Sequence, residues 1–399
     1  DKHGNILVGS SGCLFTILTS GEIKMENPGT PGAHSITDIF RDTDGNIWIG
    51  TFYNGIFYSN SERCPFIRSS IEGLEKVKLV NDIVQDSREN LWIATDQYGL
   101  YHMSEGRLQE IPGTREYKIK SLAYDADEDC LWVGRDRASL LRYDIGQKSW
   151  KEIQFHHDGA TIPMAGANVI RRHAGEFLIG SSQGLWKFNP RKESFISRKF
   201  KGYNQIVHDI ETDSEGRIWI GGNGLYTSKE DNLVHAHEVM NIKETSITAD
   251  RAFTSLSTIN DEIWAASNGR GIIVIDKEGL RNYTTANSGI ANNRCLTIEC
   301  LDDGNILTGT THGISITNRK NKSTLNYNEN NGLKIGSMRD GCIFKINDTT
   351  YLIGGTEGLA LYETSKTRLT LQDKPIRLER ISTNDQTPYI YNKEDQIIF

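Results

Sequence analysis

The chain has 399 residues, of which 37% are hydrophobic and 24% charged, and its formal net charge is −7. These values are typical of a globular protein with a large core, and the negative charge argues against a nucleic-acid partner. No apolar run reaches the roughly 18 residues that span a membrane, and the first residues lack the pattern of a signal peptide. The six cysteines are too scattered for a disulfide framework, so we expect most of them to be small buried residues.

A short motif recurs nine times along the chain. Its clearest copy is Trp-Ile-Gly-Thr at 48–51, and its third position is Gly or Ala in every copy. The copies lie at 7–10, 48–51, 92–95, 132–135, 178–181, 219–222, 264–267, 307–310 and 352–355. A near-constant spacing over nine copies indicates an internal structural repeat.

Each copy has the same order of short segments. In the second copy an apolar-rich run at 36–40 precedes the polar turn DTDGN at 42–46, then the motif at 48–51, then a third run at 55–60. A looser fourth segment leads to the next copy, and no apolar pattern of helical period appears. Four short runs separated by turns predict an antiparallel meander. The expected fold is therefore all-β: a β-propeller of four-stranded antiparallel blades.

The motif itself predicts packing rather than chemistry. Ile47, Trp48 and Ile49 are consecutive apolar residues, which indicates a strand buried on both faces, as between two blades. The small third residue allows close approach of a neighbouring segment. We expect blade-to-blade packing for the tryptophans at this position, Trp48, Trp92, Trp132, Trp219 and Trp264. DTDGN is interpreted as a hairpin turn, with calcium binding as the alternative; no metal and no cofactor are expected.

The pattern around 36–58 resembles the two-component-regulator propeller repeat, and the resemblance extends from residue 1 to about 373. The segments 286–298 and 330–338 are similar to the lead-in of that repeat. The resemblance implies the periplasmic sensor region of a Bacteroides-type hybrid two-component system. In that family two seven-bladed propellers precede an immunoglobulin-like three-tyrosine domain, a membrane helix and a histidine kinase. Residues 374–399 look like the opening strands of the three-tyrosine domain.

Nine copies do not suit one seven-bladed ring. Counting back from the tail, we expect 1–75 to be the last blades of an upstream propeller, 76–373 a seven-bladed ring, and 374–399 the start of the sandwich domain. A single ring of eight or nine blades is the alternative.

The meander places the links between second and third strands on the same face as the blade-to-blade crossings. Ligand-binding candidates on the links are Tyr53, Asn54, Asp96, Gln97, Tyr98, Arg137, Gln183, Asn223, Asn268, Arg270, His312 and Glu357. The crossings add His34, Asn81, Tyr117, Asn168, Asn204, Arg251, Asn293, Arg294 and Met338. Aromatic rings and planar polar groups together suit carbohydrate recognition. Arg135 beside Arg137 is either a solvated pair or an anion clamp.

Three functions follow as hypotheses. The first is a non-catalytic sensor of oligosaccharides from polysaccharide breakdown, facing the periplasm and acting as a homodimer through the full-length receptor. Contact with a membrane would come only through a downstream segment. The second is a scaffold that binds other proteins. The third is a glycan-cleaving enzyme using acids such as Asp96, Asp136 or Glu357, although no motif marks a carboxylate pair and no catalytic residue is assigned.

Overall fold

A computed structural model describes most of residues 4–367 and two short segments beyond them, 381–382 and 388–389. Within 4–367 the undescribed ranges are 11–13, 27–34, 43–46, 53–54, 60–64, 68–72, 74–75, 155, 158–159, 162–165, 199–202, 230–231, 240–251 and 330–331. Among the described residues, no helix has the length and apolar character needed to cross a membrane.

Seven antiparallel four-stranded sheets follow one another along the chain, and we call them blades 1 to 7. Blade 1 comprises β8 (Val80–Gln85), β9 (Leu91–Thr95), β10 (Leu100–Ser104) and β11 (Arg107–Glu110). Blade 2 comprises β12 (Ile119–Asp125), β13 (Cys130–Arg135), β14 (Leu140–Asp144) and β15 (Ser149–Ile153). Blade 3 comprises β18 (Val169–His173), β19 (Glu176–Ser181), β20 (Gly184–Asn189) and β21 (Ser194–Arg198). Blade 4 comprises β22 (Val207–Thr212), β23 (Ile218–Gly222), β24 (Gly224–Lys229) and β25 (Asn232–His235).

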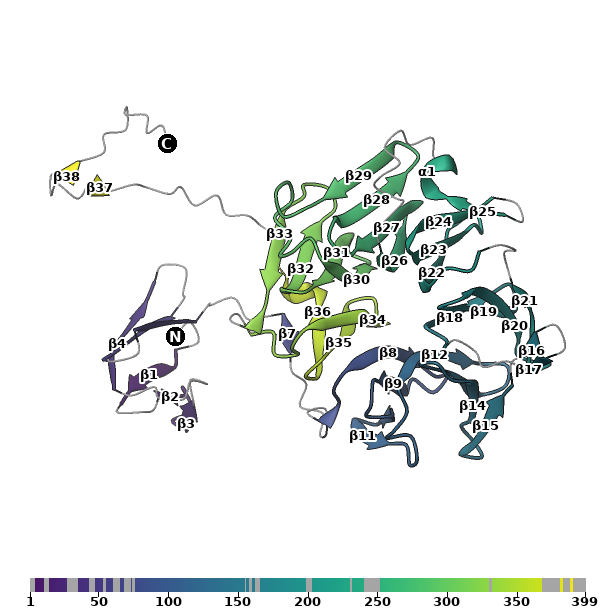
Figure 1. Cartoon of the computed structure of the whole chain (residues 1–399). Coiled ribbons are helices and arrows are strands. Elements are labelled where there is room, and N and C mark those ends of the chain that lie inside the picture. The colour runs from purple at the N-terminus through teal and green to yellow at the C-terminus, as the bar shows by residue number, and fades with distance from the viewer. Residues whose placement is uncertain are drawn as a thin grey trace. The chain divides into compact units, whose positions relative to one another are not determined.

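Blade 5 comprises β26 (Phe253–Ile259), β27 (Glu262–Ser267), β28 (Gly271–Asp276) and β29 (Gly279–Tyr283). Blade 6 comprises β30 (Cys295–Cys300), β31 (Asn305–Thr310), β32 (Gly313–Asn318) and β33 (Thr324–Tyr327). Blade 7 comprises β34 (Met338–Asn347), β35 (Thr350–Gly355), β36 (Leu359–Glu363) and β7 (Phe66–Ile67). The first strands of the seven blades lie innermost around a common centre (Figure 1). The predicted fold class, a β-propeller with a seven-bladed ring, is confirmed.

The ring is closed by a strand that precedes blade 1 in sequence. The short β7 pairs with β36, with Phe66 opposite Tyr362 and Ile67 opposite Leu361. The Phe66 ring lies 5.1 Å from that of Tyr362 and 5.2 Å from that of Tyr327. The expected boundary at 75/76 assigned β7 to the first two copies, whereas its pairing places it in blade 7. A fourth strand here covers the outer edge of β36, which would otherwise present unpaired backbone groups.

The core of the ring lies between neighbouring blades. Trp92, Trp132, Trp219 and Trp264 are each at most 2% exposed, which confirms the predicted packing role for these four. The small third residue of the motif faces the first strand of the next blade. A Cβ atom added to Gly180 would lie 2.4 Å from Val207. These glycines therefore allow the close approach of blades that the sequence indicated.

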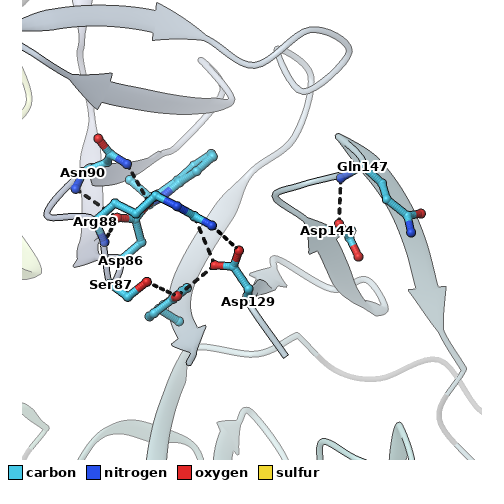
Figure 2. A network of polar contacts seen from close by, with 9 residues as sticks. Asp86, Ser87, Arg88, Asn90, Asp129, Asp144 and Gln147 are labelled. Carbon is cyan, nitrogen blue, oxygen red and sulfur yellow. Dashed lines mark hydrogen bonds and ion pairs between the residues drawn. The ribbon is translucent and has the colours of Figure 1, made fainter. Parts of the chain in front are cut away.

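The hairpin turn before the motif holds the tryptophan in place. The indole Nε1–H of Trp92 donates to Asp86 at 3.0 Å, and that of Trp219 donates to Asp213 at 2.8 Å. Figure 2 shows the turn of blade 1, in which Arg88 also forms an ion pair with Asp129 of blade 2 at 2.7 Å. The first aspartate of the turn is therefore a structural partner of the tryptophan.

The same pairing between indole and carboxylate recurs in other blades. Trp132 donates to Asp125 at 3.2 Å, and Trp264, the exception, donates to Glu262 at 2.9 Å. Where Leu replaces Trp, as at 178 and 307, the aspartate position holds His173 or Leu301, neither of which offers a carboxylate. Residues 43–46 of DTDGN lie outside the described residues, but Arg41 and Ile47 on either side of them pair antiparallel, and Trp48 donates to Asp42 at 3.0 Å.

The two copies that precede β7 form two sheets of three described strands each, which we call the N-terminal sheets. They comprise β1 (Ile6–Gly9), β2 (Leu14–Ile17) and β3 (Ile23–Glu26), and β4 (Ile36–Arg41), β5 (Ile47–Thr51) and β6 (Ile56–Ser59). The backbone N–H of Ile36 donates to the carbonyl of Ser10 at 3.4 Å, which links the two sheets. Trp48 is 39% exposed, so the prediction of a fully buried strand is wrong for this copy.

The remaining elements are short. They are the hairpin of β16 (His156–His157) and β17 (Ala160–Thr161), the helix α1 (Ala236–Val239) and a 3₁₀ turn at Thr364–Lys366. Residues 368–399 form a separate unit, in which β37 (Ile381–Ser382) pairs with β38 (Pro388–Tyr389). The four cysteines within the described residues, Cys130, Cys295, Cys300 and Cys342, are buried and free, as expected.

Candidate functional site

The first strands of most blades carry a β-bulge at one shared position. In blade 1, Val80 pairs with Thr95 and Asp82 with Ala94, which leaves Asn81 as the extra residue. The same slip in blades 2, 4, 5 and 6 leaves Lys120, His208, Thr254 and Leu296. A bulge redirects a side chain out of the regular alternation of a strand. Here it directs one side chain from each of these five blades toward the centre of the ring.

These residues line a cavity of about 420 Å³. Blade 3 contributes the residue just before β18, and blade 7 contributes a glycine from a longer irregularity in β34. We call the resulting set of seven residues, one per blade, the collar: Asn81, Lys120, Asn168, His208, Thr254, Leu296 and Gly341. Because every blade contributes its innermost strand, the cavity is the mouth of the central channel of the ring.

The collar has a polar arc and an apolar arc. Blades 1 to 4 contribute two amides, an ammonium group and an imidazole. Blades 5 to 7 contribute Thr254, Leu296 and Gly341, with Met338 beside them. The Thr254 hydroxyl donates to the Cys295 carbonyl at 3.1 Å, so toward a ligand it can act only as an acceptor, beside its methyl group. A cavity with one polar and one apolar side suits a ligand that has both kinds of surface.

Side chains near the collar also bind each blade to the next. Asn81 Nδ2 donates to the Ile119 carbonyl at 2.6 Å, and Asn168 Nδ2 donates to the Val207 carbonyl at 3.0 Å. The carboxylate of Asp82 accepts the backbone N–H of Leu122 at 2.8 Å. Asp209 accepts that of Leu256 at 2.9 Å in the same way. The aspartate in the first run of the repeat therefore has a structural role.

The junction between blades 7 and 1 carries an ion-pair network at the cavity. Arg339 Nε donates to Asn81 Oδ1 at 2.9 Å, and its Nη2 donates to Asp96 Oδ2 at 3.0 Å. Lys120 Nζ lies 3.7 Å from the same carboxylate oxygen. Asp96, a candidate ligand residue in the sequence, thus serves to join the blades.

At the cavity, one arginine lies among several acids. Arg171 Nη2 donates to Asp209 at 3.1 Å. Burial raises the pKa of Asp82 to about 6, although Arg171 opposes the shift. Burial, reinforced by Asp209, raises the pKa of Glu211 to about 7. Burial, reinforced by Glu211, raises the pKa of Glu299 to about 8. These carboxyl groups therefore titrate near neutral pH.

The structure places the described link candidates at the same end of the blades as the collar, but none of them lines the cavity. They are Asp96, Gln97, Tyr98, Arg137, Gln183, Asn223, Asn268, Arg270, His312 and Glu357. Tyr53 and Asn54 lie outside the described residues. Asn268 accepts a hydrogen bond from Arg294 at 3.0 Å, and His312 lies 2.8 Å from the amide of Asn292.

Two corrections concern the sequence-based candidates. Arg135 is neither a solvated partner of Arg137 nor an anion clamp, because its guanidinium pairs with Glu152 at 3.1 Å and covers the Tyr117 ring. The cavity residues Lys120 and His208 were overlooked inside first runs that look apolar. The sequence does contain a signal for them. A charged or polar residue within an otherwise apolar innermost strand indicates that its side chain faces the central channel.

Comparison with known proteins identifies the family to which the repeat is similar. Residues 31–53 and 202–224 match the two component regulator propeller model. The resemblance stated from the motif is thereby confirmed. No curated protein matches the chain in sequence.

Solved structures similar to this chain include two from B. thetaiotaomicron. The extracellular domain named for the hybrid two component system BT3049 is 20% identical with a TM-score of 0.67, over 98% of this chain and 55% of that one. The corresponding domain of BT4673 is 20% identical with a TM-score of 0.58, over 96% and 60%. The chain thus spans less than two thirds of the length of these structures. Virginiamycin B lyase from Staphylococcus aureus is 14% identical with a TM-score of 0.55, over 71% and 96%. At these identities the likeness shows a shared propeller fold.

Proposed function

We propose that this chain is a ligand-sensing part of a two-component receptor that faces the periplasm and binds an oligosaccharide at the collar. The observation that carries the proposal is the cavity of about 420 Å³, to which every blade contributes at least one residue from in or next to its innermost strand. The match to the two component regulator propeller and the likeness to extracellular domains of such systems support the sensor role.

The collar suits a sugar on chemical grounds. A sugar ring has an edge of hydroxyl groups and a face of C–H groups. The edge can exchange hydrogen bonds with Asn168 and His208, and the face can contact Leu296 and Met338. The volume is in the range of small-molecule sites and has room for one or two sugar units.

Signalling would be conformational. Ligand must bind one arrangement of the receptor more tightly than another, since equal affinity for both shifts no population. A ligand at the channel mouth contacts all seven blades at once, so it can change how the blades pack. The full-length protein would be a hybrid histidine kinase that acts as a homodimer and reaches the membrane through a downstream segment.

The test is binding of oligosaccharides to the 399-residue chain by calorimetry, followed by chromatography of the mixture. Saturable binding with unchanged saccharide is the expected result. Release of shortened products would instead favour the glycan-cleaving alternative. This alternative is tested because one similar propeller is named as a lyase. Absence of binding across a broad panel, together with capture of a defined protein ligand, would favour a scaffold.

The domain organisation expected from the sequence is proposed as well. The N-terminal sheets carry the repeat of the ring, yet their apolar faces are open, with Phe40 at 61% and Ile56 at 72% exposed. We propose that further blades of the same kind cover these faces, which would make them part of a second propeller. Residues 374–399 are proposed as the start of a sandwich domain.

A further inference from the structure

We infer that the collar seats an uncharged, hydroxyl-rich ligand, a neutral sugar unit, in preference to a carboxylated or sulfated one. This inference rests on the proposed function and deepens it by naming the class of saccharide. It follows from the ion pairs that the cations at the cavity already form with carboxylates of the protein.

Each cation at the cavity is committed to a carboxylate of the protein. Arg171 pairs with Asp209 at 3.1 Å. Arg339 pairs with Asp96 at 3.0 Å, and Lys120 approaches the same carboxylate at 3.7 Å. An anionic ligand would have to compete with these internal partners. It would leave behind a carboxylate without its cation, which costs free energy in a partly buried site.

One carboxylate at the cavity has no such partner. Asp136 lies in the link after β13 and lines the cavity, and within the described part of the chain no cation forms an ion pair with it. The cavity and its ion pairs hold three cations, Lys120, Arg171 and Arg339. They hold four carboxyl groups, those of Asp82, Asp96, Asp136 and Asp209. Negative charge is in excess, so the field at the mouth repels anions and accepts hydroxyl donors.

The remaining free polar groups are neutral. The His208 side chain lines the cavity, and no hydrogen-bond partner for it is found among the described residues. Burial lowers the pKa of His208, against the effect of Asp209, so the imidazole is uncharged at neutral pH. A neutral imidazole has one donor and one acceptor, which is the pattern that matches a hydroxyl group. The Nδ2 of Asn168 donates to the carbonyl of Val207, which fixes the orientation of the amide and leaves its oxygen as an acceptor for a ligand.

The test compares saccharides that differ only in charge. Methyl-esterified oligogalacturonides are measured against their de-esterified forms, and desulfated chondroitin oligosaccharides against sulfated ones, beside neutral gluco-, galacto-, arabino-, fructo-, manno- and xylo-oligosaccharides. Affinity for the 399-residue chain is measured by calorimetry. We expect the uncharged member of a pair to bind at least about tenfold more tightly, a difference of about 1.4 kcal/mol. That affinity should change less than about twofold between about 20 and 300 mM salt.

A variant at the collar is compared with a control variant on an outermost strand. His208→Ala should weaken neutral saccharide binding about tenfold or more, and His208→Gln, which keeps a neutral hydrogen-bonding group, should weaken it less. Gln109→Ala alters an exposed side chain on β11, the outermost strand of blade 1, and should leave affinity unchanged. The thermal midpoint of each variant shows whether the ring has folded.

Each other outcome has a distinct meaning. Tighter binding of the charged member, weakened by salt, overturns the inference and leaves the proposed function standing. Failure of the whole panel to bind overturns the proposed function and the inference with it. Neutral binding that tolerates His208→Ala, or that Gln109→Ala weakens as much as His208→Ala does, shows that the collar is not the site.

Discussion

The N-terminal sheets and the ring are built from the same repeat, yet their tryptophans lie in different environments. Trp48 is 39% exposed, whereas its counterparts Trp92 and Trp219 are 2% and 1% exposed. Among the described residues, the exposed large hydrophobic side chains all belong to the N-terminal part, and they are Ile6, Val8, Ile23, Met25, Phe40, Trp48, Phe52 and Ile56. Since the local sequence is shared, the neighbour on each face must make the difference.

This comparison shows that a blade is not stabilised by its own sheet alone. A four-stranded meander is apolar on both faces and can bury only what an adjacent blade covers. In the ring every blade has two such neighbours because β7 closes the circle. The same substitution should therefore have a large effect in the ring and a small one in the N-terminal sheets, and matched pairs of variants test this.

The largest difference is expected for the motif tryptophan. Trp219→Ala should destabilise the ring by about 3–5 kcal/mol, because it removes a fully buried side chain. Trp48→Ala should cost less, about 1–2 kcal/mol, since 39% of the side chain is already exposed. Urea unfolding, with hydrogen exchange to assign the affected segment, measures both. Equal losses at the two sites would show that the blades are independent of their neighbours.

A second pair concerns the closure of the ring. Phe66→Ala should destabilise blade 7 by about 3 kcal/mol, because Phe66 is 5% exposed and packs on Tyr362. Phe52→Ala, at a side chain that is 68% exposed, should stay within about 0.5 kcal/mol. Faster hydrogen exchange in β36 for the Phe66 variant alone is the expected signature. Unchanged exchange in β36 would mean that β7 is dispensable for closure.

The architecture was predictable because the repeat is redundant. Nine copies each place Gly or Ala two residues after Trp or Leu, so a misread segment in one copy does not change the number of repeats. The closure was not predictable in the same way. The strand β7 pairs through only Phe66 and Ile67, and two residues carry no periodicity. The indole–carboxylate pairing was visible in principle, because Trp accompanies Asp at 86 and 213 while Leu178 accompanies His173.

The candidate site was predicted at the correct end of the blades, and three crossing candidates, Asn81, Asn168 and Met338, line the cavity. Links such as that at Gln183 are variable and exposed, which is what sequence reasoning detects. The cavity also depends on β-bulges that bring in Lys120 and His208, which were not candidates. A bulge is a register shift between two strands, so one strand read alone does not reveal it. Whether the link residues contact a ligand stays a prediction.

A third pair tests the turn aspartate. Asp213→Asn should destabilise the ring by about 1–2 kcal/mol, because the carboxylate accepts from Trp219 at 2.8 Å and from Arg217 at 2.7 Å. Asp42→Asn alters the same indole contact at the exposed Trp48 and should cost less than about 0.5 kcal/mol. Chemical denaturation of both variants at neutral pH gives the comparison. A larger loss at Asp42 than at Asp213 would contradict the role assigned to burial.

The smallest effect is expected from pH. Burial, with Glu211 and Asp209 nearby, raises the pKa of Glu299 to about 8, while Arg171 and Lys345 oppose the shift. An acid whose folded-state pKa is raised favours the folded state most when it is protonated. Its stabilising effect is complete below the unfolded pKa and is lost as pH rises through about 8.

The thermal midpoint of the ring should therefore fall between pH 5 and pH 9, and Glu299→Gln should reduce that fall by about 1–3 °C. Glu110→Gln, at an exposed glutamate on β11, should leave the profile unchanged. Calorimetric scans across this range measure the effect. Because the described residues of the N-terminal sheets contain no buried acid, the opening free energy there, taken from hydrogen exchange after correction for the intrinsic rate at each pH, should not follow the same pH dependence. Parallel changes in both regions would mean that the channel carboxyl groups are not the origin.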